Sequence, residues 1–393
     1  MTDVDRLKDA ARRAVEAAGP ELIGLSHRIQ ANPELAFQEH SAAGWVVDAL
    51  AAGGFAVERG VADLPTALMA TAGTGELTVG LCAEYDALPE VGHACGHNVI
   101  AAASVGAGIA LASVAGELDI TVRVLGTPAE EKGGGKVLML ERGAFDGIHA
   151  AMLVHPGPFG ADEVQCTAIA CSELVVEFTG RAAHAAAYPQ LGRNAADAAT
   201  VAQVAVGLLR QHLESSDRVH GIVTHGGAAP NVIPERTTMS YYLRAPRLER
   251  LDELERRVRD CFEAGAMATG CTVAIRQDGP TYSHFEGDID LEALYAANLK
   301  AIGTEPQPAP NDVFYSTDMS NVSLAIPTIH PTVGIDSGQA VNHEAAFAAR
   351  CAEPSADRAV LRGATAMAWT CIDAATDDVL RRRLLAGTRR TGR

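Results

Sequence analysis

The chain has 393 residues, and its 32 lysines and arginines against 49 aspartates and glutamates give a formal net charge of −17. Hydrophobic residues make up 48% and charged residues 21%, an ordinary globular composition that excludes a wholly disordered, collagen-like or coiled-coil chain. The length predicts two or three domains, and an acidic chain without a dense basic stripe is unsuited to nucleic acid, whose binding depends on phosphate neutralisation.

The N-terminus and the cysteines indicate the compartment. Residues 1–13 are charged and lack the apolar core of a signal peptide. The longest apolar stretch, residues 99–115, contains glycines and is too short to span a membrane, so it predicts a buried helix. Eight cysteines without a C-x-x-C pair are too sparse for a disulfide scaffold. We therefore expect a cytoplasmic protein with reduced thiols and no membrane contact.

The first half of the chain alternates predicted helices and strands. A helical pattern over residues 6–30 is expected to break at Gly19-Pro20. The elements expected after it are a strand at 77–83, a helix at 98–114, a strand at 119–125, a helix at 137–142 and a strand at 150–154. This alternation predicts an α/β fold with a mainly parallel sheet flanked by helices. Ligands of such folds lie beyond the carboxyl ends of the strands.

The pattern changes near Cys171. The expected elements are then a strand at 173–179, a helix at 194–212, strands at 221–225 and 238–244, a helix at 247–268 and a strand at 271–276. The order β-α-β-β-α-β predicts a compact α+β module. Residues 280–287 would lead back to the first domain, and the remainder supplies further helices. Six arginines from Arg381 onward predict a solvated helix end.

Three groups of potential metal ligands follow the three strands predicted in the first half. Cys95 and His97 flank a glycine, Glu130 and Glu131 follow a proline, and His155 ends the third strand. Each group alone is weak evidence, but the carboxyl ends of neighbouring strands would bring them together. The mixture of donors suits zinc or another first-row divalent metal, and their number allows two ions about 3.5–4 Å apart. One glutamate would then bind metal while its neighbour takes a proton from activated water.

A set of motifs in fixed order resembles the dinuclear metallopeptidase and aminoacylase family, which includes carboxypeptidases and auxin-conjugate hydrolases. The motifs are NPELAFQE at 32–39, EYDALP at 84–89, GHACGHN at 92–98, PAEE at 128–131, HP at 155–156, GRAAHAAAYPQLGRNAADA at 180–198, NVIPE at 231–235 and STDMSNVS at 316–323. The branch with aminobenzoyl-glutamate hydrolase and β-alanyl-lysine dipeptidases is the most similar. The resemblance covers residues 27–343.

This resemblance implies a metal centre and its chemistry. It implies five ligands for two divalent metal ions, zinc or manganese: Cys95, His97, Glu131, His155 and His343. Glu130 is then the general base, and His330 is the competitor of His343 for the last ligand position. Many relatives carry a ligand histidine two residues before Asp86, where this chain has Glu84. Asp86 is therefore expected to orient a ligand from outside the metal's own ligand set.

The resemblance also implies a lid and dimerisation domain inserted into the catalytic domain of a homodimer. The expected boundaries are 1–171 and 285–393 for the catalytic domain and 172–284 for the inserted domain. His184 is implied as the donor to the transition-state oxyanion, in its own subunit or across the dimer. Asn231 and Arg244 are implied to hold the substrate's carboxylate end, and His27 is a structural support.

The expected activity is the hydrolysis of the amide bond of a dipeptide or N-acyl amino acid by metal-activated water. An aminobenzoyl-glutamate-type conjugate is the alternative substrate, although the charge of −17 favours a basic or neutral dipeptide. A non-catalytic, metal-stabilised binding protein is the alternative of another class, but it would need no base such as Glu130. A serine hydrolase lacks support because no G-x-S-x-G motif occurs. Residues 133–136 resemble a phosphate loop only superficially, since Val137 replaces Ser or Thr.

Overall fold

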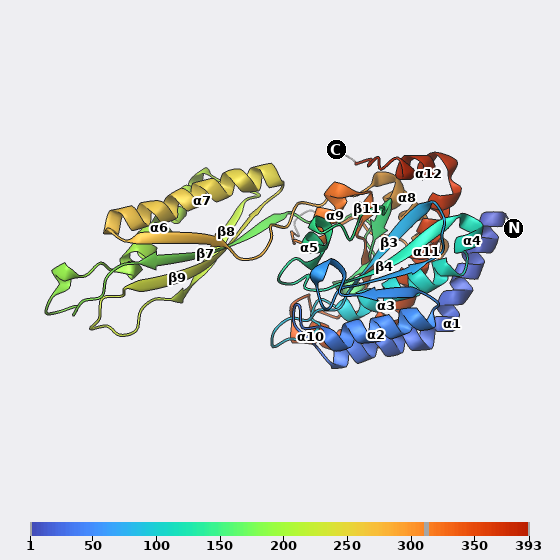
Figure 1. Ribbon diagram of the computed structural model, residues 1–393, viewed down its shortest axis with the longest axis horizontal. Coiled ribbons are helices and arrows are strands. Elements are labelled where there is room, and N and C mark those ends of the chain that lie inside the picture. The colour runs from blue at the N-terminus through green and yellow to red at the C-terminus, as the bar shows by residue number, and fades with distance from the viewer. Residues whose placement is uncertain (1, 310–313, 392–393) are drawn as a thin grey trace. The chain divides into compact units, whose positions relative to one another are not determined.

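The computed structural model describes residues 2–309 and 314–391, and the chain divides into two compact units (Figure 1). Unit 1 contains residues 1–167 and 285–393, and unit 2 contains residues 168–284. Each unit has its own cluster of buried apolar side chains. The strand that opens unit 2 begins at Ala170. Unit 2 is therefore an insertion between two segments that fold together.

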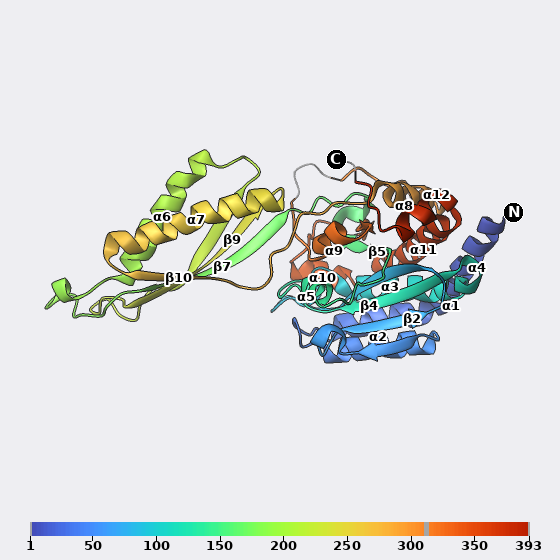
Figure 2. The same ribbon diagram turned by 45° about the horizontal axis from the view of Figure 1, so that its top comes forward.

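Unit 1 is built on a six-stranded sheet in the order β1-β2-β4-β3-β5-β11 (Figures 1 and 2). Its strands are β1 (Ala56–Arg59), β2 (Leu68–Ala72), β3 (Leu77–Glu84), β4 (Ile120–Thr127), β5 (Ala150–Met152) and β11 (Thr328–Ile329). Strands β4, β3, β5 and β11 run parallel, β2 is antiparallel to β4, and β1 is antiparallel to β2. The mainly parallel sheet is thus confirmed. A separate parallel pair joins β6 (His155–Gly157) to β12 (Thr332–Gly334).

Helices supply the rest of unit 1. They are α1 (Asp3–Ala31), α2 (His40–Ala52), α3 (His97–Ala112), α4 (Ala115–Leu118), α5 (Gly135–Glu141), α8 (Ile289–Ala301), α9 (Met319–Ala325), α10 (Ala345–Arg350), α11 (Pro354–Thr376) and α12 (Asp378–Leu385), with short 3-10 turns η1 (Val61–Asp63) and η2 (Pro158–Gly160). Helix α3 contacts β3 and β4 as well as α1 and α11, so it is buried on all sides. Glycines allow this packing: a methyl group at Gly108 would lie 2.5 Å from Val124.

Helix α3 is the apolar stretch that the sequence predicted as a buried helix, and that prediction is confirmed. Within residues 2–309 and 314–391, no helix is both long and apolar enough to cross a membrane.

The expected break at Gly19-Pro20 is wrong, because α1 continues through Pro20 from Asp3 to Ala31. A proline inside a helix removes one backbone hydrogen bond and costs about 3 kcal/mol. Packing of α1 against α3 and α11 outweighs this cost. Gly19, which is buried, lies under the side chain of Leu361 of α11. Tertiary contact therefore overrides the local signal.

The expectation of a solvated arginine-rich helix end holds for Arg382 and Arg390, which are exposed, but it is wrong for Arg381 and Arg383. In α12, Arg381 donates a 3.0 Å hydrogen bond to the Leu118 carbonyl and pairs with Asp119 at 2.8 Å. Arg383 pairs with Asp288 at 2.7 Å, and the side chains of both arginines are only 16% exposed. These arginines fasten the C-terminal segment to unit 1. Of the six, Arg393 lies outside the described residues.

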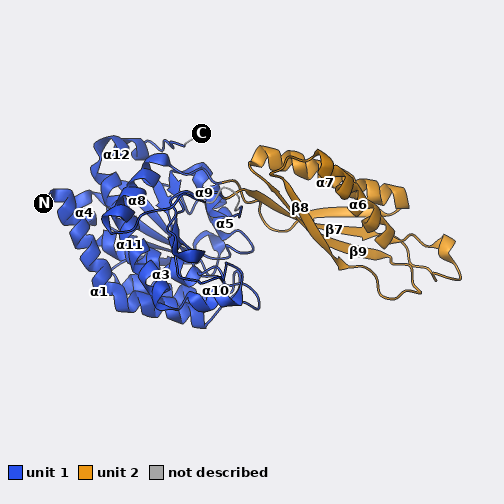
Figure 3. Cartoon of the chain, turned by 180° about the vertical axis from the view of Figure 1, so that it is seen from behind, with its two compact units in different colours: residues 1–167, 285–393 blue, residues 168–284 orange. Residues whose placement is uncertain are grey.

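Unit 2 has the predicted order of elements, β-α-β-β-α-β (Figure 3). They are β7 (Ala170–Thr179), α6 (Ala195–Leu209), β8 (Arg218–His225), β9 (Arg236–Ala245), α7 (Leu248–Thr269) and β10 (Thr272–Gln277), with 3-10 turns η3 (Pro189–Leu191) and η4 (Arg210–His212). The antiparallel sheet has the order β10-β7-β9-β8. Alternate residues of β9 are buried against α6 and α7, while β8 forms an edge that is exposed along most of its length.

Candidate metal centre

The predicted ligands gather at the carboxyl ends of the parallel strands of unit 1. Glu130 and Glu131 follow β4, which ends at Thr127. Cys95 lies in the loop between β3 and α3, and His97 is the first residue of α3. His155 opens β6, just beyond β5. The topology thus brings together the three groups that the sequence predicted to meet.

Two groups of three donors share the Cys95 sulfur. The first consists of Cys95, His97 and His155, and the second of Cys95, Glu131 and His343; within each group the donor atoms lie within 4.8 Å of one another. Ligands about 2.0–2.3 Å from one ion lie at most about 4.6 Å apart, so the 4.8 Å limit is close to the span of one coordination shell. His343, not His330, completes the second group. The ring of His330 instead stacks on His155 at 5.6 Å between centroids.

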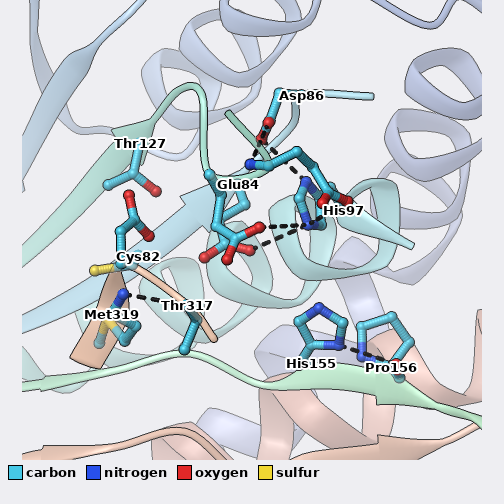
Figure 4. A network of polar contacts seen from close by, with 12 residues as sticks. Cys82, Glu84, Asp86, His97, Thr127, His155, Pro156, Thr317 and Met319 are labelled. Carbon is cyan, nitrogen blue, oxygen red and sulfur yellow. Dashed lines mark hydrogen bonds and ion pairs between the residues drawn. The ribbon is translucent and has the colours of Figure 1, made fainter. Parts of the chain in front are cut away.

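His97 is held so that one ring nitrogen faces the other donors (Figure 4). Its Nδ1 lies 3.0 Å from Asp86 Oδ1, and Asp86 Oδ2 accepts the backbone N–H of Glu131 at 2.9 Å. Its Nε2 is buried and, among the described residues, has no hydrogen-bond partner. Carboxylate oxygens of Glu84, Glu130 and Glu131 lie 3.5, 3.7 and 3.9 Å from that nitrogen. A buried nitrogen left in this way fits a metal ligand oriented by Asp86.

The other two histidines of the donor groups, His155 and His343, each contact a backbone carbonyl of another residue. His155 Nδ1 lies 3.0 Å from the Pro156 carbonyl oxygen, which leaves Nε2 for the group with Cys95 and His97 (Figure 4). His343 has a positive φ of 71°, and its N–H donates to the Ala94 carbonyl at 2.9 Å. Its Nε2 lies 3.8 Å from Glu131 Oε2, and its side chain is 62% exposed. The second group therefore borders solvent.

The electrostatics of these donors fit a cation. Burial, followed by the nearby Glu131 carboxylate, raises the pKa of the Cys95 thiol well above its usual value. Burial and the charges of Glu84 and Glu131 raise the pKa of Glu130 in the same way, and burial raises the pKa of Glu131. Anionic donors that crowd a buried space resist ionisation, and a divalent cation reverses this by favouring their charged forms. The donor set therefore fits a pair of divalent metal ions.

The histidines of the first group differ in their titration. Burial opposes a charge on His97, but Asp86 and then Glu84 and Glu131 outweigh it and raise the pKa of His97 well above its usual value. Burial and the neighbouring His330 lower the pKa of His155 to about 3, so this ring is neutral, the form that binds metal.

A buried ion network beside the donors was missed by the sequence analysis. Lys136 Nζ, on α5, lies 2.6 Å from both Glu84 Oε1 and Asp318 Oδ1, and all three side chains are inaccessible to solvent. Burial alone would raise the pKa of Glu84, but the Lys136 ammonium lowers it to about 2. Lys136 thus keeps Glu84 charged beside His97. The only sequence signal was the Gly-Gly-Gly-Lys run, which does not indicate a buried lysine.

Unit 2 brings two of its three predicted residues together. The Ala185 N–H donates to the Asn231 carbonyl at 3.0 Å, and His184 bridges to Val232. The exposed His184 ring accepts backbone N–H bonds at Nδ1 from Ala186 and Ala187, at 3.3 and 3.1 Å. Its neutral form therefore carries the proton on Nε2, ready to donate to an external oxygen.

Arg244 lies at the other end of β9. Its guanidinium is 5.7 Å from the ring centroid of Tyr242, and it is paired in register with Cys171 near the start of β7. Asn231 precedes β9, so the length of that strand, about 26 Å from residue 236 to residue 244, separates the two. Within one chain, Asn231 and Arg244 do not share a binding position. His27, the expected structural support, lies in unit 1 with Nε2 2.8 Å from Asp357.

Comparisons with known proteins find similar sequences over most of this chain. The model of peptidase family M20/M25/M40 matches residues 80–362. The Xaa-Arg dipeptidase of Mus musculus is 38% identical over 99% of this chain and 92% of its own length. One of the subunits of the p-aminobenzoyl-glutamate hydrolase of Escherichia coli is 34% identical over 74% of this chain and 64% of its own length.

A solved structure supports the fold. A Bacillus subtilis protein, described as a dinuclear metal-binding peptidase of the M20 family, matches 91% of this chain and 99% of its own chain with a TM-score of 0.69. At 21% identity this likeness concerns the fold alone.

Proposed function

The chain belongs to peptidase family M20/M25/M40, and we propose that it is a dipeptidase for substrates with a basic C-terminal residue. Its relatives described as a dipeptidase and as a p-aminobenzoyl-glutamate hydrolase subunit act on amide bonds. Membership makes the chain a metal-dependent amide hydrolase. The main structural support for this activity is that two groups of metal donors share Cys95 and that Glu130 lies beside them.

The residues of unit 1 would bind the metal ions and supply the general base. Cys95, His97 and His155 would hold one divalent ion, and Cys95, Glu131 and His343 the other. Bound ions of this kind lower the pKa of a coordinated water and polarise a carbonyl. Glu130 would take the proton from the attacking water and return it to the leaving amine. We propose zinc or manganese, since the sulfur and imidazole donors suit first-row metals.

Unit 2 would complete the site as part of a homodimer. The proton on His184 Nε2 suits an oxyanion donor, and Arg244 suits a carboxylate. The separation of His184 and Asn231 from Arg244 along β9 favours an active site that combines residues of two subunits. Exposed apolar side chains support dimerisation: Val204 and Leu208 on α6 are 58% and 70% exposed, and Ile222 on the edge strand β8 is 65% exposed.

The basic substrate is proposed on two grounds. The Mus musculus relative is described as an Xaa-Arg dipeptidase, and the net charge of −17 attracts cations more than anions. An aminobenzoyl-glutamate conjugate is the second candidate, because the E. coli relative is described as part of a hydrolase of that compound.

We also propose a cytoplasmic location, which suits eight cysteines that are all free thiols.

A substrate screen tests the proposal. Purified protein loaded with zinc or manganese is assayed on dipeptides ending in arginine, lysine, alanine or glutamate, on N-acetyl amino acids and on aminobenzoyl-glutamate. We expect kcat/KM for the basic dipeptides to exceed that for the acidic substrates at least about tenfold, a difference of ~1.4 kcal/mol. Chelation should abolish hydrolysis, and added metal should restore it. A preference for aminobenzoyl-glutamate would replace the proposed substrate, and activity that survives chelation would refute the metal mechanism.

Complementation of two inactive variants tests the shared active site. In a dimer of Glu130→Gln with His184→Ala, one site would retain both the general base and the donor from the partner subunit. Because half of the dimers formed by random exchange are mixed and each has one intact site, the mixture should recover about a quarter of wild-type activity. The measurement is hydrolysis after the two variants are mixed under subunit exchange. No recovery in demonstrably mixed dimers would place His184 in its own subunit.

A further inference from the structure

A buried carboxylate outside the donor groups holds the backbone next to Glu130. Glu39 is the N-cap residue that precedes α2, and it is inaccessible to solvent. Its Oε1 accepts the backbone N–H groups of Phe37 and Ala129, both at 2.9 Å, and its Oε2 accepts the Thr66 hydroxyl at 2.8 Å. Burial and the nearby Asp86 raise the pKa of Glu39 to about 7. A charged carboxylate is therefore costly at this position, and three hydrogen bonds offset part of the cost of burying it.

Both backbone donors to Glu39 Oε1 have an unusual conformation. Phe37 has a φ of 61° and Ala129 a φ of 60°, in the left-handed region that residues with a side chain rarely adopt. Such residues persist where surrounding interactions hold them, and they are concentrated at active sites. Ala129 is fully buried and immediately precedes Glu130. The direction in which the Glu130 side chain leaves the backbone depends on this conformation.

The same contact joins two loops that are far apart in the sequence. Glu39 and Ala129 are 90 residues apart. The ring of Phe37 packs on Gly133, where an added Cβ would lie only 2.4 Å from it. The loop after β4 is thus fixed on both sides of the Glu130–Glu131 pair, by Glu39 before it and by Phe37 after it.

We propose that Glu39 is a positioning residue for amide hydrolysis, which holds Ala129 in its left-handed conformation and thereby aims Glu130 at the reacting water. The inference rests on the proposed role of Glu130. Glu39 lies outside the donor groups, so its loss should displace the base without removing a metal ligand. A displacement of about 1 Å costs on the order of 100-fold in rate.

The test uses three variants and one matched control. Glu39→Ala removes the acceptor, while Glu39→Gln keeps an oxygen that can accept the two N–H bonds. Ala129→Gly in the Glu39→Ala background supplies a residue that adopts positive φ without help. The control is Glu34→Gln, because Glu34 also accepts backbone N–H bonds, from Ser41 and Ala42 at 2.9 Å, at the start of the same helix.

We expect Glu39→Ala to lower kcat about 10- to 100-fold with KM and metal content nearly unchanged. The kcat of Glu39→Gln should stay within about fivefold of wild type. Adding Ala129→Gly to Glu39→Ala should raise kcat about tenfold above that of Glu39→Ala alone, and Glu34→Gln should have wild-type kcat. Loss of kcat in proportion to loss of metal or of folded protein would reduce Glu39 to a structural residue. Wild-type kcat in Glu39→Ala would overturn the inference and leave the proposed function intact.

A second readout does not depend on activity. Hydrogen exchange of the peptide covering residues 128–135 reports the opening of the Ala129 loop. We expect exchange at least about tenfold faster in Glu39→Ala than in wild type or Glu34→Gln. If no dipeptide is hydrolysed by the wild-type protein, the proposed function fails, and unchanged exchange in Glu39→Ala refutes the positioning role separately.

Discussion

Replacing Glu130 with glutamine is expected to lower kcat by about 10²- to 10⁴-fold while two metal ions stay bound. Glutamine has nearly the same shape as glutamate but cannot accept a proton from water. Glu130 Oε2 lies 3.7 Å from His97 Nε2. Glu130 could join a third group of donors with Glu84 and His97, but it belongs to neither of the groups that share Cys95. The measurements are steady-state kinetics and the metal content of the purified variant.

The neighbouring glutamate provides the control. Glu131 belongs to the group with Cys95 and His343, so Glu131→Gln should reduce the metal content as well as the rate. The contrast between adjacent, chemically identical side chains separates a base from a ligand. Near-wild-type turnover in Glu130→Gln, or loss of metal equal to that in Glu131→Gln, would show that the general base is another residue.

Replacing Cys95 with serine is expected to affect both metal ions at once. The sulfur of Cys95 is the only donor common to both groups, and a serine hydroxyl does not ionise as a thiol does beside a metal. Both affinities should fall by more than about 100-fold, which exceeds the usual effect of removing a residue that only orients a ligand. Metal titration and metal analysis measure the number of ions and their affinities.

His343→Ala is the matched control for a donor that serves one group. It should lower the affinity for one ion and leave the affinity for the other unchanged, because His343 occurs only in the group with Cys95 and Glu131. Circular dichroism checks that each variant is folded. A Cys95→Ser protein that still binds one ion with wild-type affinity would falsify the shared role of Cys95.

Strong periodic signals predicted most of the fold, and short or irregular elements were missed. The apolar runs that became β3 and β4 lie at the centre of the sheet, where both faces are buried. Strand β11 has only two residues, Thr328 and Ile329, and exists because it pairs with β5. Nothing local distinguishes such a segment from a loop. The same limit explains α1, where packing carries the helix through Pro20.

The identity of the candidate donors could be predicted from the sequence, but their grouping could not. Residue type and position after a strand singled out Cys95, His97 and the pair Glu130–Glu131, and the family resemblance implied that Glu131 is the ligand of the pair. Only the tertiary structure shows that Cys95 lies within reach of two groups, and that Asp86 contacts both His97 and the backbone of Glu131. Lys136 and Glu39 show a further limit, because buried charges that are matched by distant partners carry no local pattern.

The insertion of unit 2 has a consequence for the order of synthesis. Four of the five proposed ligands precede residue 168 and have left the ribosome before any of unit 2, but His343 follows all of it. Strand β11 and the arginine contacts of α12 are made later than the first sheet strands for the same reason. A nascent chain that ends within or just after unit 2 therefore carries an incomplete second donor group. On the proposed assignment of ligands, full hydrolytic competence would be withheld until translation has passed His343.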